Sequence, residues 1–459
     1  MPCQPRLWRV LAMTSCAPAR SLLFVVLVTL PALAGAVDLV QAYRLALAND
    51  SQVASARLQL NAIREKLPQA EAAFRPQVNS AATLQQQYGE IFPARGNQYS
   101  TDFTNQNYSV SLTYPIYRAQ NAEVLEQSKL QISVAETQLA AASQDLVLRV
   151  SQAYFDVLAS QDNLATIGAQ KRAITEQLAA AKRNFEVGTA TITDQQEAQA
   201  RFDLAVAQEL AALNDLEVKR AALALLVGRQ VGTLSMLKPG IQLSAPQPAQ
   251  ESQWTSAARE ANYSVQQAKL NSEIAKREIE RQRVANNFTV DLVTSVAHGR
   301  SANFNQVGTN SVIGGVGVQV AKPLYTGGLI ESRIKEALAS HERTQSDLET
   351  ARRQAELAAR QAFYGVNSGL AQIRALEAAE RSSQLALDSN LLGYQVGVRI
   401  NIDVLNAQQQ LFTTRRDLAR ARYDTLLNGL RLKTTNGSLG ESDLTTVNAM
   451  LVAGAPAGK

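Results

Sequence analysis

The feature that most constrains the fold is a long stretch without helix-breaking residues, at positions 121–185. It contains no proline and one glycine. Apolar side chains recur in it every seven residues, as in the series Leu125, Ile132, Leu139 and Leu146. This spacing is typical of an α-helical coiled coil. At 1.5 Å per residue the helix would be on the order of 100 Å long, which exceeds the core of a globular domain.

A second helix is expected at residues 194–227, where the same apolar pattern continues. Small residues stand at intermediate core positions of the first helix, namely Ser128, Ala135 and Ala142. Because small side chains let helices approach closely, each long helix can pack against more than one neighbour. The sequence therefore predicts several long helices side by side.

The long helices belong to a pattern that occurs twice. Residues 185–188 (Phe-Glu-Val-Gly) are followed by Asp194, and residues 394–397 (Tyr-Gln-Val-Gly) are followed by Asp403, at a constant shift of 209 positions. Further matches in the same order are 50–58 with 262–270, 114–117 with 322–325, and 152–155 with 361–364. Similar helix composition does not account for the shared Pro and Val-Gly residues. Each half is thus expected to contain helix, two strands, a very long helix, a turn and a helix.

This pattern divides the chain into segments. We expect a signal peptide, a first repeat, a proline-containing linker, a second repeat and a polar, poorly ordered C-terminal tail. Their boundaries are 1–36, 37–230, 231–250, 251–436 and 437–459.

The first segment has the pattern of a removable targeting signal. Three arginines precede an apolar run at residues 22–34 that ends in small residues. The run is shorter than the roughly 20 residues needed to span a bilayer, and a proline interrupts it. Cleavage after Ala34 and cleavage after Ala36 both fit. The mature protein is therefore expected outside the cytoplasm.

Composition excludes several classes of chemistry. Cys3 and Cys16 both lie in the signal segment, so the mature chain has no thiol for a disulfide or a metal. The net charge of +5 is small for 459 residues, and basic residues alternate with acidic ones, which argues against a nucleic-acid partner. His298 and His341 are isolated. We expect no metal site, no cofactor and no enzymatic activity.

Four segments alternate polar and apolar residues as strands do, at 77–88, 107–113, 288–296 and 312–320. Pro115 and Pro323 are expected to end the second strand of each hairpin, because proline cannot continue the ladder. Long polar loops are expected at 93–104 and 298–310. Each strand approaches the roughly 9 to 11 residues of a tilted membrane strand, and charge is nearly absent apart from Asp291.

Four strands are too few to close a membrane barrel, since known barrels begin at about eight. Either several chains pool their strands in one outer-membrane barrel, or the strands form a small soluble sheet against the helices. The scarcity of charge favours the shared barrel.

The duplicated hairpins, the junctions at 114–117 and 323–328, and the paired Val-Gly turns resemble the TolC family of outer-membrane efflux and secretion proteins. The resemblance covers residues 38–436. It implies an α+β fold that is mostly α: a trimeric outer-membrane β-barrel with four strands per chain, continued by a long periplasmic α-helical coiled-coil barrel.

The resemblance also implies function and location. Family members are passive export conduits in the cell outer membrane that extend into the periplasm and contact outer-membrane lipid. They form homotrimers and join an inner-membrane ABC or proton-driven efflux pump through a periplasmic adaptor, also called a membrane fusion protein. The cargo, drugs or secreted proteins, is left open.

The family closes its periplasmic entrance with bonded residues at the helix ends. Tyr394 and Arg399 match the gate residues of the second half, and Thr193 and Asp194 match their partners in the first. Arg can bond bidentately to a carboxylate, and a Tyr hydroxyl can join it. An alternative for Asp194 is that its carboxylate only caps the following helix.

Two further sets of functional residues, at a tunnel constriction and at an adaptor contact, follow from the resemblance. Asp403 matches the first acidic position of the family's tunnel constriction, whereas the second position carries Asn406 instead of an acid. The constriction is therefore expected to be less negative than in the family. Residues at the Val-Gly turns are expected to contact the adaptor: Val187, Gly188, Val396 and Gly397.

The main rival from another class is a soluble periplasmic coiled-coil adaptor or scaffold with a minor strand domain. Such adaptors usually pair one helical hairpin with flanking β segments, whereas here helices follow a strand hairpin twice. A general porin does not fit, because helix outweighs strand.

Overall fold

The computed structural model describes residues 36–92, 95–303 and 306–452. The predicted signal peptide, apart from Ala36, and both cysteines lie outside the described residues. Four long helices dominate the described part: α4 (Ala119–Glu186), α5 (Ile192–Val227), α8 (Leu329–Gln395) and α9 (Asn401–Thr435). Helix outweighs strand, so the expected mostly-α, α+β class is confirmed. The long helices predicted from the seven-residue spacing are also confirmed.

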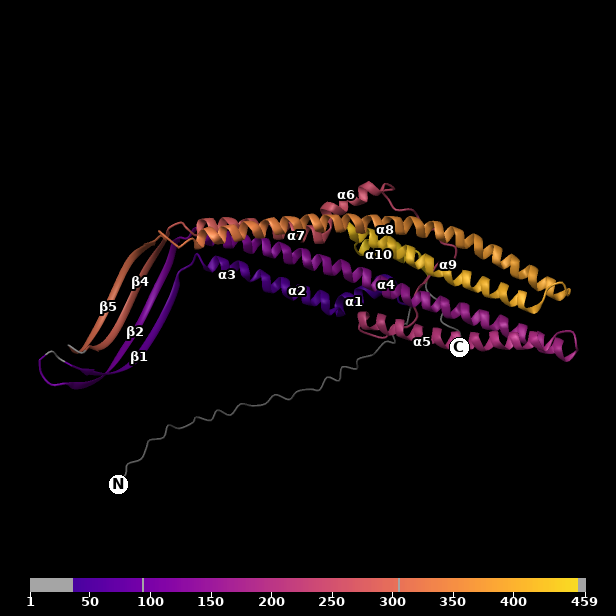
Figure 1. Cartoon of the computed structure of the whole chain (residues 1–459), viewed down its shortest axis with the longest axis horizontal. Helices are drawn as coiled ribbons and strands as arrows, with labels where there is room; N and C mark the ends of the chain where they lie inside the picture. The colour runs from indigo at the N-terminus through magenta and orange to yellow at the C-terminus, as the bar shows by residue number, and fades with distance from the viewer. Residues whose placement is uncertain (1–35, 93–94, 304–305, 453–459) are drawn as a thin grey trace, which may run out of the picture. The chain divides into compact units, whose positions relative to one another are not determined.

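The long helices pair as two antiparallel hairpins. Helix α5 packs on α4, and α8 packs on α9, while α9 also contacts α4. The turns that close the two hairpins lie at one end of the helices, and the strands lie at the other (Figure 1). Among the described residues, no helix is both long enough and apolar enough to cross a bilayer.

Shorter helices flank the long ones toward the strand end. Helices α1 (Leu39–Asn49), α2 (Ser51–Arg64) and α3 (Lys66–Ala72) pack on α4. Helix α6 (Glu251–Ala261) packs on α8, and α7 (Tyr263–Val284) packs between α8 and α4. The matched segments found in the sequence are helix starts: Asp50 caps α2 and Asn262 caps α7 through their side chains.

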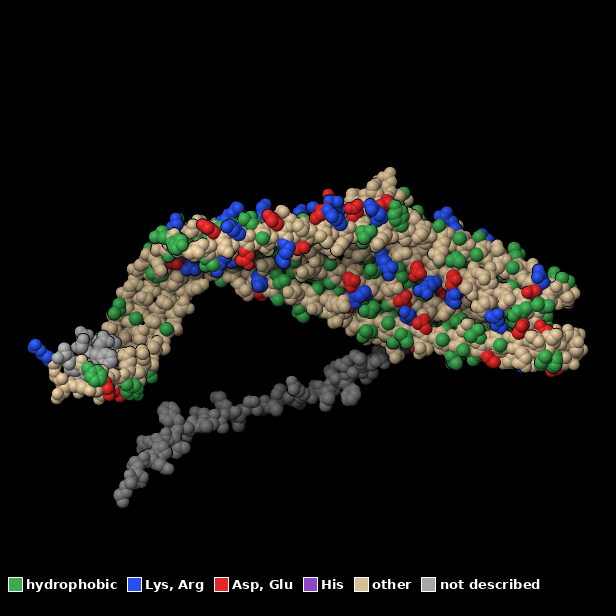
Figure 2. Space-filling model, in the orientation of Figure 1, with side chains coloured by type: hydrophobic (Ala, Val, Ile, Leu, Met, Phe, Trp, Pro, Cys, Tyr) green, Lys and Arg blue, Asp and Glu red, His purple; other side chains and the backbone are tan. Residues whose placement is uncertain are grey.

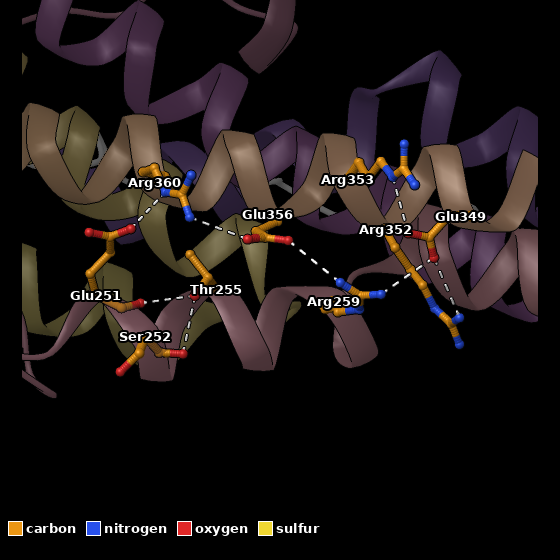
Figure 3. A network of polar contacts seen from close by, with 9 residues as sticks. All are labelled: Glu251, Ser252, Thr255, Arg259, Glu349, Arg352, Arg353, Glu356 and Arg360. Atoms are coloured by element: carbon orange, nitrogen blue, oxygen red, sulfur yellow. Dashed lines mark hydrogen bonds and ion pairs between the residues drawn. The ribbon is translucent and has the colours of Figure 1, made fainter.

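Helix α6 is held on α8 by apolar and charged contacts. Trp254 is buried against Phe363, Val366 and Leu370. Along the exposed side, the charges alternate in sign between the two helices (Figure 3). Arg259 of α6 lies 3.4 Å from Glu349 and 3.7 Å from Glu356 of α8. Because these pairs are solvent-exposed, they orient α6 more than they stabilise it.

Four strands form one antiparallel sheet in the order β1-β2-β4-β5. Their bounds are β1 (Gln77–Ile91), β2 (Tyr99–Tyr117), β4 (Thr289–Asn303) and β5 (Gln306–Ala321). All four predicted strands are confirmed. The expected long loops are wrong, because the strands extend into 93–104 and 298–310 and leave connections only between Ile91 and Tyr99 and between Asn303 and Gln306.

The expectation that Pro115 ends its strand is wrong. Strand β2 continues to Tyr117, and Pro115 pairs with Asp291 next to an irregularity in register. Gln77, the first residue of β1, pairs with Thr113, so Pro115 lies beyond β1 and interrupts no ladder on that side. Strand β5 ends at Ala321, before Pro323 as expected.

One face of the sheet is apolar and exposed. The register aligns Tyr108 with His298 and Val312, and Val110 with Val296 and Gly314, so these residues share a face. Val312 is 72 % exposed. On the face seen in Figure 2, charged side chains of both signs cover the helices, and along the strands they appear only near the hairpin end.

The charge at the helix end of the sheet is neutralised. Asp291, the carboxylate noted in the sequence, is buried and accepts two hydrogen bonds from Arg118, at 2.9 and 2.8 Å. Arg118 directly follows β2 and precedes α4. This pair therefore ties the strand-to-helix junction of the first half to a strand of the second half.

Residues 437–452 are not the poorly ordered tail that was expected; the predicted tail beyond Val452 lies outside the described residues. Residues 441–448 form α10 (Glu441–Asn448), and β6 (Leu451–Val452) pairs with β3 (Met236–Leu237) of the linker. Leu444 is fully buried and belongs to the largest apolar cluster. Composition suggested a solvated tail, but periodic leucines and valines give this segment a face to bury.

The largest apolar cluster joins the two ends of the described part of the chain to the long helices. Tyr154 of α4 is fully buried in it, and its hydroxyl donates to the main-chain oxygens of Val37 and Ser235, at 3.0 and 2.9 Å. The Tyr154 hydroxyl thus holds Val37, just before α1, and Ser235 of the linker at the same point of α4.

Candidate functional site

The two turns that close the helical hairpins have the same backbone geometry. Gly188 and Gly397 adopt φ of 78° and 80°, a left-handed conformation that other residues rarely adopt. Val187 and Val396 beside them are 72 % and 66 % exposed. Each glycine thus reverses the chain after its long helix, and a valine is presented to solvent at each turn.

The Asp194 carboxylate is engaged in its own helix start. Thr191 and Asp194 form a reciprocal capping box: the Asp194 amide donates to the Thr191 hydroxyl, and the Thr191 amide donates to the carboxylate at 3.0 Å. Thr193 is exposed. This geometry agrees with the capping alternative for Asp194.

Arg399, in the turn before α9, and Asp403, in the first turn of α9, face each other. Their side chains lie 3.7 Å apart, one turn from each other at the start of α9. Within one chain, no side-chain hydrogen bond among the described residues joins Thr193 or the Asp194 carboxylate to Tyr394 or Arg399. The structure of a single chain therefore does not bring the four predicted gate side chains together.

Other residues link the two hairpins near their turns. Asn184 of α4 donates to the Tyr394 hydroxyl at 3.2 Å. Asn401, the first residue of α9, is 1 % exposed. It accepts from Gln177 of α4 at 2.5 Å and donates to the main-chain oxygen of Asp194 at 3.2 Å. Of the predicted gate residues, Tyr394 and Asp194 thus take part in contacts between hairpins, through partners that the sequence did not indicate.

These partners belong to a column of amide side chains on α4. Gln170, Gln177 and Asn184 are spaced by seven residues, and Gln170 donates to Gln409 of α9 at 2.7 Å. A seven-residue spacing keeps side chains on one face of a coiled-coil helix. The seven-residue spacing of these amides is visible in the sequence, but a prediction based on apolar heptads does not include them.

The buried contacts inside each hairpin near the turns are apolar, while ion pairs such as Lys171–Glu209 and Arg415–Glu380 lie along the edges of the hairpins. Ile174, Leu178 and Ala181 of α4 pack on Ala198 and Ala205 of α5, and Leu405 of α9 joins them. In the second hairpin the buried set is Leu387, Val404 and Leu411. The α4–α9 boundary near the turns is thus the more polar one.

The predicted constriction residues line an open groove on α8 and α9. Asp403 and Asn406 lie there with Arg399, Ser382 and Gln410. Arg201 of α5 donates from Nη2 to the Asn406 side-chain oxygen at 3.0 Å. The second constriction position therefore lacks an acid and also has a guanidinium bound to it.

No other kind of site stands out in the part of the chain that the structure describes. No group of three or more His, Cys, Asp or Glu residues is arranged to hold a metal ion among these residues.

Comparison with known proteins identifies similar chains. The family described as "Outer membrane efflux protein" matches residues 42–229 and 254–438. Outer membrane protein TolC of Vibrio cholerae serotype O1 is 31% identical over 427 residues, which are 92% of this chain and 96% of that protein. Alkaline protease secretion protein AprF of Pseudomonas aeruginosa is 29% identical over 424 residues, 91% of this chain and 88% of that protein.

A solved structure shows the same fold. The outer membrane protein VceC of Vibrio cholerae superposes with a TM-score of 0.74 at 18% identity, over 87% of this chain and 96% of that one.

Proposed function

The chain belongs to the family of outer membrane efflux proteins, and we propose that it is a passive export channel of a tripartite system, gated at the helix ends. The family consists of channel proteins and not of enzymes. The finer statements that follow, on assembly, gate, partners and cargo, belong to this proposal.

The observation that carries the proposal is the form of the sheet. Strands β1 and β5 are each paired on one side only, and all four strands contribute to an exposed apolar face. An unpaired edge in lipid would cost several kcal/mol per unsatisfied group, so the edges need partners. Pooling the sheets of a homotrimer into one barrel pairs every edge and turns the apolar face toward outer-membrane lipid.

The long helices would then continue the barrel as a tunnel through the periplasm. Their far ends carry the proposed gate, made of Thr193, Asp194, Tyr394 and Arg399. Within a chain the links are Asn184 to Tyr394 and Asn401 to Gln177 and Asp194. Thr193 is exposed, and Arg399 lies 3.7 Å from Asp403 of its own chain; both are proposed to bond a neighbouring chain. Breaking these links would let the helical hairpins separate.

The exposed turns suit a partner at the tunnel entrance. Val187, Gly188, Val396 and Gly397 are proposed to contact a periplasmic adaptor, which joins the channel to an inner-membrane ABC or proton-driven pump. Relatives include a protein named for alkaline protease secretion and an outer membrane efflux protein, BepC of Brucella suis. Drugs and secreted proteins therefore both remain candidate cargo.

Membrane fractionation tests the assembly. The protein is expected in the outer-membrane fraction, and an unboiled gel should show a trimer that boiling converts to monomer. A soluble monomer would overturn the channel and favour the alternative, a periplasmic adaptor or scaffold. Deletion strains assayed separately for drug sensitivity and for loss of a secreted protein would identify the cargo class.

Single-channel recordings test the gate. Asn401→Ala removes one acceptor and one donor between the hairpins, so conductance or open probability should rise. Gln395→Ala alters an exposed amide at the end of α8, beside the turn, and serves as the control. Equal recordings from both variants and wild type would contradict the gate as assigned.

A further inference from the structure

The contact between Arg201 and Asn406 changes the charge expected at the constriction. Asn406 occupies a position where the family resemblance implies an acid. Arg201 of α5 donates to its side-chain oxygen at 3.0 Å, which orients the amide with its carbonyl toward the cation. A guanidinium stays protonated at all physiological pH values, so the charge at this point is permanent.

The charge of Arg201 is not neutralised locally. Among the residues that the structure describes, no carboxylate lies within 4.0 Å of its guanidinium, and its hydrogen-bond partner, Asn406, is neutral. Arg201 is half-buried, so solvent screens it less than a fully exposed cation.

The acidic residue of the same groove is partly compensated. Asp403 lies 3.7 Å from Arg399, and both line the groove with Asn406. Each chain thus contributes Arg201 and Arg399 against the single carboxylate of Asp403. Among the charged residues that line the groove, together with the cation bound to Asn406, the sum is one positive charge per chain, the opposite of an acidic ring.

We propose that Arg201 is a selectivity residue that makes the entrance of this channel favour anionic over cationic solutes. The inference rests on the proposed function, because it requires that Asp403 and Asn406 line the conduit. Charges that line a narrow passage raise the local concentration of ions of opposite sign. Copies of Arg201 around a common axis would add their fields at the constriction. Anionic cargo is then admitted more readily than cationic cargo of the same size.

Reversal potentials of the purified full-length protein in planar bilayers test the proposal. With a tenfold gradient of KCl, wild type is expected to prefer Cl⁻ over K⁺. Arg201→Gln should lower the Cl⁻/K⁺ permeability ratio by about twofold or more. Arg201→Lys, which keeps the positive charge, should retain most of the wild-type ratio. Arg220→Gln removes a cation elsewhere on α5, where Arg220 pairs with Glu217, and should leave the ratio unchanged.

The outcomes separate this inference from the proposed function. Channels that form in all variants but share one permeability ratio would overturn the role of Arg201, as would a wild type that prefers K⁺. A loss of selectivity in Arg201→Lys equal to that in Arg201→Gln would also overturn it, because geometry and not charge would then be responsible. Absence of any conductance, wild type included, would instead contradict the channel itself.

Discussion

At the scale of single residues, the two halves differ where a matched position has acquired different partners. Asp50 and Asn262 both cap the helices that follow them. Asp50 also binds Arg149 of α4, at 2.9 Å, whereas Asn262 donates to the main-chain oxygen of Thr435. The position that corresponds to Arg149 in the second half is Ala358. A carboxylate therefore serves in the first half, where it meets an arginine, and an amide serves in the second half, where it meets a main-chain oxygen.

The Asp50–Arg149 pair predicts a pH-dependent stability. The hydrogen bond from Arg149 holds the pKa of the nearly buried Asp50 below its ordinary value of 3.8. Since the folded-state pKa is the lower one, the stabilisation is present above pH 3.8 and is lost as pH falls through the folded pKa. Asp50→Asn keeps the cap but loses the charge, so it should destabilise by about 1–3 kcal/mol at pH 7.

Thermal unfolding, monitored by circular dichroism at pH 7 and at pH 3, measures the contribution of the Asp50 charge to stability. The gap in melting temperature between wild type and Asp50→Asn should narrow at pH 3. The control Glu71→Gln removes an exposed pair with Arg75 and should change little at either pH. A gap of constant size would mean that the charge of Asp50 does not stabilise the fold.

At the scale of helices, the buried contacts near the turns are mainly apolar within each hairpin, and amide hydrogen bonds join the two hairpins there. Buried amides in a coiled coil fix register at a cost in stability, because both donor and acceptor must be paired. When two helices part, amides bond to water, whereas apolar side chains lose their burial. Near the turns, the α4–α9 boundary is therefore expected to separate at the lower cost, whereas farther along it Phe155 stacks on Tyr423 in the buried core.

Replacing an amide pair with an apolar pair tests this boundary. Gln177→Leu alone leaves the Asn401 side-chain oxygen without its donor and should destabilise by about 1–3 kcal/mol. The double variant Gln177→Leu with Asn401→Leu should recover stability and lengthen the closed periods of single channels. The matched control Gln196→Leu lies on the exposed side of α5. A double variant that opens more often than Gln177→Leu alone would contradict the prediction.

At the scale of the whole molecule, the segment after the second repeat connects parts that are distant in sequence. Asn448 of α10 accepts from the amide of Leu39, Glu441 pairs with Arg44 at 2.8 Å, and β6 pairs with the linker. The segment thus closes the described chain on itself near the middle of the long helices.

Deleting residues 441–459 should therefore lower stability. Full burial of an apolar side chain contributes about 1.5–3 kcal/mol, and Leu444, Val447 and Leu451 would all be lost from the cluster around Tyr154. The melting temperature and the amount of trimer on an unboiled gel should fall. Truncation after Val452 keeps these contacts and is the control. Equal trimer levels in both truncations would show that the segment is dispensable.

The sequence by itself determined the elements and their order. Seven-residue spacing, the Val-Gly turns and period-two alternation are local signals, since each reflects the geometry of one helix, turn or strand. The duplication further related the halves, and family resemblance indicated the residues of the gate. Trp254 and the Asp194 cap were also foreseeable, because burial of an aromatic residue and capping both involve near neighbours in sequence.

Only the tertiary structure decided which neighbour each face meets. A heptad identifies a buried face but not its partner, so the bonds of Asn401 to Gln177 and of Arg201 to Asn406 could not be derived from spacing. The burial of α10 depends on a surface assembled from α1, α4 and the linker, which are distant along the chain. The preference for helix or strand depends on a few consecutive residues, so it can be predicted from the sequence. Contacts between distant side chains depend on the packing of the whole chain, so they cannot be predicted in the same way.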